Sequence, residues 1–280
     1  MPISKTEGTI SRKSLGPKLH HTMTVPEGAP RAALGLIHGY ADHGARYAHV
    51  TDHLAQKGIA CVTIDLRGHG RSEGPRGFCE LFDEFLDDAS ELLRLVEERF
   101  PDAKRMLFGH SFGGLVSAES VLKRPGGWSA LLLSAPFFAL EMQVPGVKVA
   151  AAKVASSVYP KLALPSGLSG KDVTHDEARA KAYDEDPLVF KSATARWFTE
   201  TRLAQAHALE NAHKVELPLY MTFGEADKIA SFAAGKRFFD RTGSKDKTWD
   251  PKKGLFHEVL NEPSWKEVAD KMAEFVLAHA

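Results

Sequence analysis

The feature that most constrains the fold is an alternation of short apolar runs with helix-like stretches along the 280 residues. Amphipathic segments separate the runs, and the clearest of them, 81–100, carries apolar residues at three- and four-residue steps. The apolar runs lie at 33–37, 59–66, 105–108, 130–134, 219–223 and around 248–249. Strands that alternate with helices are typical of a mainly parallel sheet covered by helices on both faces. We therefore predict an α/β protein.

One interval breaks this alternation. Between 130–134 and 219–223 lie about eighty residues with no convincing strand, which is too long for a loop in a compact domain. The interval contains several helical stretches and is interrupted by Pro145, Pro160, Pro165 and Pro187. We predict that residues 138–214 form a helical cap on a core built from 1–137 and 215–280. Its expected place is over the carboxyl ends of the strands, where open α/β sheets bind ligands.

The remaining global features exclude several protein classes. Lys plus Arg (36) balances Asp plus Glu (36), which argues against a nucleic-acid partner. No run of 18 apolar residues occurs and residues 1–10 are polar, so neither a membrane span nor a signal peptide is predicted. Cys61 and Cys79 are too few for a disulfide framework and favour a reduced, cytoplasmic protein. Residues 8–25 predict two strands around the turn Leu15-Gly16-Pro17.

The motif Gly-x-Ser-x-Gly occurs twice, centred on Ser72 and on Ser111. A nucleophile elbow needs a strand before the serine and a helix after it. Ser111 meets this condition, because an apolar run precedes it and a helix-compatible stretch follows. Ser72 does not, because the Gly-Pro-Arg-Gly at 74–77 cannot start a regular helix. The sequence therefore predicts Ser111 as a nucleophile and Ser72 as a polar turn residue.

A serine nucleophile needs a base and an acid that orients the base. In strand–elbow–helix hydrolases the order along the chain is Ser, acid, His. Asp227 follows the run 219–223, and His257 follows the last expected strand. We predict these two residues as acid and base, with Glu225 as the nearest alternative to Asp227.

An acyl-transfer site also needs donors for the oxyanion of the tetrahedral intermediate. The backbone N–H of Phe112 is one candidate, because this residue directly follows the nucleophile. The second is the N–H of Tyr40 in the loop after the first parallel strand, and we expect the Tyr40 side chain to line the substrate pocket. The 13 histidines show no metal-ligand spacing, so we expect neither a metal ion nor an organic cofactor.

These motifs together resemble the α/β-hydrolase superfamily, and within it the monoacylglycerol lipase and lysophospholipase-like branch. The segments that carry the resemblance are 38–47, 65–70, 109–114, 134–136, 184–188, 224–227 and 257–262. His43-x-x-Arg46-Tyr47 and His257-Glu258-Val259-Leu260 narrow it to the branch. The resemblance implies an α/β-hydrolase fold and an ion pair between Asp42 and Arg46 that braces the oxyanion loop. Tyr40 departs from the pattern because it is bulkier than the residue often found there.

The residues and the resemblance together predict a serine ester hydrolase that acts on small lipid-like esters through an acyl-enzyme. One alternative is a proline-type serine aminopeptidase, which would need an acidic site in the cap for the substrate amine. The candidate acids for that site are Glu141, Asp172, Asp176 and Glu177. A further alternative is a non-catalytic binding protein on the same fold. Such proteins often lose a member of the triad, whereas Ser111, Asp227 and His257 are all present.

The cap carries an apolar stripe that bears on the substrate. One helical face collects Val147, Ala150, Ala151, Val154, Ala155 and Val158. The stripe either packs on the sheet domain or forms an apolar wall for an acyl chain and rests peripherally on a membrane surface. In the second interpretation Val154 and Val158 contact the substrate. The acyl length, the alcohol and the oligomeric state stay open at this level.

Overall fold

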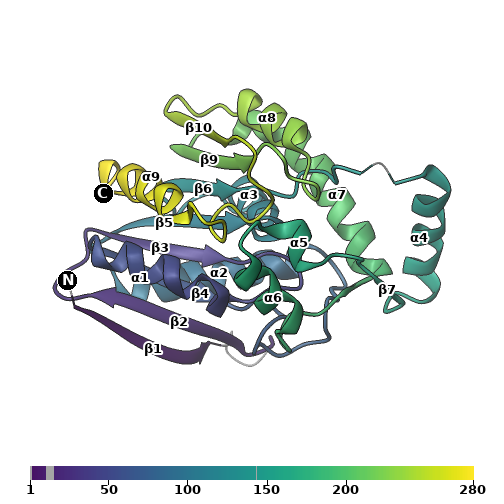
Figure 1. Cartoon of the computed structure of the whole chain (residues 1–280), viewed down its shortest axis with the longest axis horizontal. Helices are drawn as coiled ribbons and strands as arrows, with labels where there is room; N and C mark the ends of the chain where they lie inside the picture. Colours follow the sequence, from purple (N-terminus) through teal and green to yellow (C-terminus); the bar gives the residue numbers. More distant parts are fainter. Residues whose placement is uncertain (1, 11–15, 143) are drawn as a thin grey trace.

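The computed structural model describes residues 2–10, 16–142 and 144–280 and is built around an eight-stranded sheet (Figure 1). The strand order is β1-β2-β4-β3-β5-β6-β9-β10. Its parallel strands are β3 (Ala32–Ile37), β4 (Ile59–Ile64), β5 (Lys104–His110), β6 (Ala130–Ser134), β9 (Leu219–Gly224) and β10 (Lys247–Lys252). Each contains one of the predicted apolar runs or most of it. β3, β4, β6 and β9 are buried along their whole length, which explains their continuous apolar character.

The N-terminal strands extend the sheet in the opposite sense. β1 (Ile3–Ile10) and β2 (Leu19–Pro26) form an antiparallel pair, and β2 pairs antiparallel with β4. The two strands predicted for residues 8–25 are therefore present. The turn predicted at Leu15-Gly16-Pro17 begins outside the described residues.

Helices cover both faces of the sheet. α1 (Ala48–Gln56) and α9 (Trp265–Ala278) pack on one face, and α2 (Asp83–Arg99), α3 (Phe112–Lys123) and α8 (Phe232–Arg241) pack on the other. A 3₁₀ turn, η1 (Gly44–Tyr47), leads directly into α1. Sequence analysis did not identify α8, a ten-residue helix that places Phe238 and Phe239 in the core.

The segment between β6 and β9 lies at the carboxyl ends of the parallel strands. Its elements are α4 (Gly146–Val158), β7 (Ala163–Pro165), α5 (Gly170–Val173), α6 (Glu177–Glu185), β8 (Ser192–Thr194), α7 (Ala195–Asn211) and η2 (Ala212–Lys214). β7 and β8 pair antiparallel, although the sequence showed no convincing strand here. Each has only three residues, too few for a period-two pattern. Figure 1 shows α4 at the end of the molecule farthest from α1 and α9. No helix in the described ranges has the length and apolar character needed to cross a membrane.

Candidate active site

Ser111 lies on a sharp turn between β5 and α3. Its backbone has φ 53° and ψ −117°, a region that is costly for a residue with a side chain. The turn is held by the Ser111 N–H, which donates to the Ser134 carbonyl over 2.9 Å. A side chain at Gly109 would meet the Gly113 carbonyl, and one at Gly113 would meet the carbonyls of residues 37 and 38. The two glycines of the motif are therefore required by close backbone approaches.

The structure brings together the three side chains predicted from separate parts of the sequence. The His257 Nε2 atom lies 2.8 Å from the Ser111 Oγ, and its Nδ1 lies 2.7 Å from the Asp227 Oδ2. The other Asp227 oxygen accepts the N–H groups of Ile229 and Ala230 at 2.8 and 3.0 Å. This leaves Asp227 as an acceptor that fixes the orientation of the imidazole.

All three side chains are buried, and the surroundings of His257 change its pKa. Burial disfavours the charged imidazole of His257, but the adjacent Asp227 carboxylate outweighs it and raises the histidine pKa. The ring of His110 lies 4.9 Å from that of His257 and stays neutral, because burial lowers its pKa to about 4. The site therefore contains one imidazole poised to accept a proton and one that is not.

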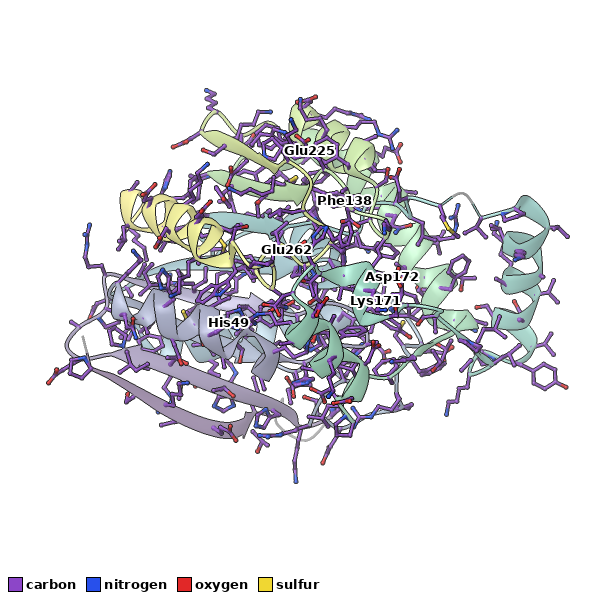
Figure 2. All side chains as sticks on the ribbon, in the orientation of Figure 1. His49, Phe138, Lys171, Asp172, Glu225 and Glu262 are labelled. Carbon is purple, nitrogen blue, oxygen red and sulfur yellow. The ribbon has the colours of Figure 1, made fainter. Side chains whose placement is uncertain are left out.

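The two alternative candidates, Ser72 and Glu225, lie in different surroundings. The Ser72 hydroxyl donates to the Asp65 carbonyl over 2.5 Å and accepts the His20 N–H over 2.8 Å, so it has a structural role in a turn. Glu225 is exposed on the loop after β9 (Figure 2), whereas Asp227 is buried against His257.

The predicted oxyanion donors lie on two neighbouring segments. Phe112 is the first residue of α3, so its N–H has no carbonyl one turn earlier in the helix. Tyr40 lies in the loop after β3, and the next residue, Ala41, has a φ of 61°. The Tyr40 hydroxyl donates to the Ser192 carbonyl over 3.0 Å, and its ring stacks on Trp197 at 3.6 Å. The bulky side chain is thus held by β8 and α7 while its ring borders the cavity.

A cavity of about 370 Å³ opens above Ser111, and both apolar and polar side chains line it. Its apolar wall consists of Phe137, Leu140, Met142, Pro165, Leu168, Val173, Ala193, Trp197, Phe198 and Ile229. Its polar part, beside Ser111 and His257, holds Asp42, His110, Tyr183 and Glu258. Further polar residues line the cavity between the apolar ones, namely Ser166, Thr201, Arg202, Gln205 and Lys228. The Tyr183 hydroxyl forms no hydrogen bond with another residue in the described ranges. An apolar chain and a polar group can therefore occupy the two parts together.

Val154 and Val158, predicted as substrate contacts, are absent from the cavity wall. They are 65% and 61% exposed on α4, and α4 turns its other face, with Val149 and Ser156, toward α7. The stripe therefore faces outward instead of lining the pocket or packing on the sheet. A helical period identifies an apolar face but does not say which neighbour, if any, that face meets.

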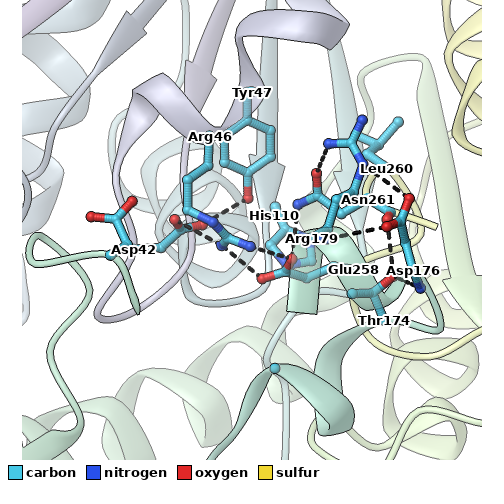
Figure 3. Close-up of polar contacts among 12 residues, drawn as sticks. Asp42, Arg46, Tyr47, His110, Thr174, Asp176, Arg179, Glu258, Leu260 and Asn261 are labelled. Carbon is cyan, nitrogen blue, oxygen red and sulfur yellow. Dashed lines mark hydrogen bonds and ion pairs between the residues drawn. The ribbon is translucent and has the colours of Figure 1, made fainter. Parts of the chain in front are cut away.

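An ionic cluster borders the cavity, and sequence analysis predicted only part of it. It consists of Asp42, Arg46 and Glu258 (Figure 3), and the predicted ion pair between Asp42 and Arg46 is present with a nitrogen–oxygen distance of 3.0 Å. Glu258 contributes a second pair with Arg46 at 2.7 Å. Its position directly after His257 was the available signal. Across residues 2–10, 16–142 and 144–280, no group of three His, Cys, Asp or Glu side chains could hold a metal ion.

Comparison with known proteins identifies the family of the chain. Residues 28–264 match the family described as "Serine aminopeptidase, S33". The chain belongs to this α/β-hydrolase family. It is 30% identical over 265 residues to a monoacylglycerol lipase of Mycolicibacterium smegmatis, with 94% of each chain covered. It is 28% identical over 241 residues to "Phospholipase YtpA" of Bacillus subtilis, covering 85% of this chain and 92% of that one.

The fold comparison agrees with the sequence comparison. The monoacylglycerol lipase of Paleococcus ferrophilus matches with a TM-score of 0.83 at 26% identity, with all of both chains covered. The resemblance inferred from the motifs is therefore confirmed, and so is the α/β-hydrolase fold. The protein is a serine ester hydrolase of the monoacylglycerol lipase-like branch.

Proposed function

We propose that the protein is a monoacylglycerol lipase or a lysophospholipase-like carboxylesterase that works through Ser111, His257 and Asp227. The observation that carries the proposal is the continuous hydrogen-bonded line from Asp227 through His257 to Ser111, at the base of a cavity with an apolar and a polar part. The named relatives support the same substrate class.

The proposed reaction proceeds in two steps. Ser111 attacks the acyl carbonyl while His257 takes its proton, and Asp227 stabilises the resulting imidazolium. The N–H groups of Tyr40 and Phe112 donate to the oxyanion. His257 then protonates the leaving alcohol, and water hydrolyses the acyl-enzyme by the same route in reverse.

The two parts of the cavity suggest how a substrate lies. The acyl chain lies along the apolar wall, where each buried CH₂ contributes about 0.8 kcal/mol. The alcohol lies in the polar part, where the unpartnered hydroxyl of Tyr183 is available for a hydrogen bond. A small polyol such as glycerol fits this division better than a second acyl chain.

The outer part of the cap, residues 144–165, supports contact with a membrane surface. Its large exposed apolar side chains are Val147, Val154, Val158, Tyr159, Leu162 and Leu164. The segment carries Lys148, Lys153 and Lys161 and no acidic residue. Apolar side chains interspersed with lysines are suited to the interface of a lipid layer. We propose that this outer cap rests on the lipid layer that supplies the substrate. The exposed stripe then helps the substrate to reach the cavity and does not line the cavity itself.

The aminopeptidase alternative lacks a suitable acid at the cavity. Among the described residues, none of the four candidate cap acids lines it. Asp172 accepts from Ser169 in a capping box, and Asp176 caps α6 through Ala178 and Arg179. The acids that do line the cavity, Asp42 and Glu258, are both paired with Arg46. The site is therefore better suited to a lipid ester than to a peptide with a free N-terminal amine.

A hydrolysis panel tests the proposal. It compares monoacylglycerols, lysophospholipids, acetate esters, di- and triacylglycerols and aminoacyl amides at equal concentration. We expect higher kcat/KM for medium and long monoacyl esters than for acetates or for di- and triacylglycerols, and no turnover of amides. Preferential cleavage of aminoacyl amides would favour the peptidase instead, and a preference for acetates would leave a general esterase.

A further inference from the structure

We infer that Glu258 is a positioning residue whose ion pair with Arg46 holds the His257 loop in register with the loop that carries the Tyr40 N–H. Glu258 directly follows His257 in the chain, so a fixed Glu258 carboxylate also restricts the backbone that carries the imidazole. The inference deepens the proposed function and rests on the roles proposed there for Ser111 and His257.

The contact between the two loops is bidentate. Arg46 donates from Nη1 to Glu258 Oε1 over 2.8 Å and from Nη2 to Oε2 over 2.7 Å. The same guanidinium donates to Asp42 Oδ1 over 3.0 Å. All three side chains are at most 10% exposed. A buried two-point ion pair fixes both distance and angle between the groups it joins, which an exposed pair does not.

The Arg46 side of this contact leads directly to the oxyanion loop. Asp42 lies two residues after Tyr40, and its carboxylate accepts the His43 N–H over 2.7 Å and the Tyr47 hydroxyl over 3.1 Å. These hydrogen bonds hold the backbone between Tyr40 and Asp42 in place, against the cost of the positive φ at Ala41. Arg46 therefore transmits the position of this loop to Glu258.

The Glu258 side leads to the cap. Asn261 donates to Glu258 Oε2 over 2.8 Å and accepts from Arg179 of α6 over 2.9 Å (Figure 3). The Glu258 N–H donates to the Val173 carbonyl of α5 over 2.9 Å. The Glu258 carboxylate is thus fully satisfied, and it joins the histidine loop to two separate parts of the structure.

The cluster also sets the charge near the base. Two carboxylates and one guanidinium leave a net charge of about −1 if the groups hold their usual charges at neutral pH. Burial opposes ionisation of Glu258, but Arg46 outweighs it and lowers the pKa of this carboxyl. The titratable groups that face His257 are Asp227, Ser111, the neutral His110, and the Asp42 and Glu258 carboxylates. Glu258 therefore supports the raised pKa of His257 as well as its position.

The test measures how fast a fluorophosphonate modifies the nucleophile as a function of pH. This reaction needs the base and the oxyanion donors but no lipid, so it separates the inference from the choice of substrate. The variants are Glu258→Gln, which removes the charge, and Glu258→Asp, which keeps the charge but shortens the reach. Glu225→Gln is the matched control, because the same chemical change is made at an exposed position on a neighbouring loop.

We expect Glu258→Gln to lower the labelling rate on the high-pH plateau of the pH–rate curve about tenfold or more, because the base is misplaced. Removal of a carboxylate also moves the midpoint of this pH–rate curve to lower pH by roughly 0.5 unit or more, because the His257 imidazolium is less stabilised. Glu258→Asp should lower the plateau with little change in midpoint, and Glu225→Gln should match the wild type.

A wild-type rate and midpoint in folded Glu258→Gln would overturn the inference. Circular dichroism checks folding, which is expected to survive because Arg46 keeps Asp42 as a partner. Should that variant not fold, Glu258→Asp decides: a lowered plateau supports the positioning role and an unchanged one overturns it. Failure of the lipid panel with these labelling results intact would count against the proposed substrate alone.

Discussion

The cap meets the rest of the protein in two opposite ways. Its inner part, residues 170–185, is hydrogen-bonded to the catalytic loop: Thr174 donates to the Asn261 carbonyl over 2.9 Å, and the His175 N–H donates to Glu262 over 2.9 Å. The outer cap contacts the molecule mainly through α7 and exposes most of its large apolar side chains, with Val147 at 77% and Tyr159 at 70%. One stretch of chain thus combines a part fixed to the catalytic loop with an open apolar surface, which we propose to contact the lipid substrate.

This contrast follows from what each part must do. Proton transfer requires the base within hydrogen-bond reach of the nucleophile, and small displacements are costly. Lipid capture requires apolar surface that stays available to the solvent or to a membrane. We therefore expect substitutions in the inner region to lower turnover of all esters alike, and substitutions in the outer cap to discriminate between substrates.

The largest effect is expected at the catalytic end. Asp227→Asn should lower kcat by roughly 10³–10⁴ because the imidazole loses its orienting carboxylate, and His257→Ala should be at least as damaging. The loss should be the same for short and long acyl esters, as steady-state kinetics on both will tell. Glu225→Gln is the control, and a greater loss there than in Asp227→Asn would mean that the wrong carboxylate has been chosen.

The next effect concerns the hydrogen bonds of the inner cap. Glu262 is fully buried and accepts the N–H groups of His175 and Phe256, one on each carboxylate oxygen. Glu262→Gln should lower the free energy of unfolding by about 1–3 kcal/mol, since the amide cannot accept from both donors in this way. Denaturant unfolding measures the loss.

The matched control for this change is Glu274→Gln on the exposed side of α9, which should alter stability by less than about 0.5 kcal/mol. Equal stabilities of the two variants would show that the inner cap is not held through Glu262.

The smallest effect is expected in the outer cap. Val154→Asp or Val158→Asp should lower activity a few-fold on long-chain esters presented in vesicles and leave short soluble esters unaffected, because a charge on this surface opposes insertion into lipid. The fold should survive, since both side chains are exposed. Vesicle sedimentation together with kinetics on both substrates measures the change.

Leu81→Asp, at an exposed leucine outside the outer cap, serves as the control for this pair. Uniform losses on short and long esters in Val154→Asp would remove the distinction between the two parts of the cap.

The sequence predicted features that depend on local patterns, and it missed features that depend on contacts between distant segments. The strands of the eight-stranded sheet, α2 and the elbow at Ser111 were predictable because each is set by a local pattern of apolar residues and glycines. The pairing of Arg46 with Glu258 was not, because it joins residues 212 positions apart. The orientation of α4 was not predictable either. Periodicity shows an apolar face, but packing against α7 decided that the stripe containing Val154 points outward.

The central claim is that Ser111 is the nucleophile activated by His257. Its most direct test is peptide mapping after reaction with a fluorophosphonate, using the wild type, Ser111→Ala and Ser72→Ala. We predict a single adduct on Ser111 that is lost in Ser111→Ala and retained in Ser72→Ala. An adduct on Ser72, or undiminished labelling of Ser111→Ala, would contradict the account.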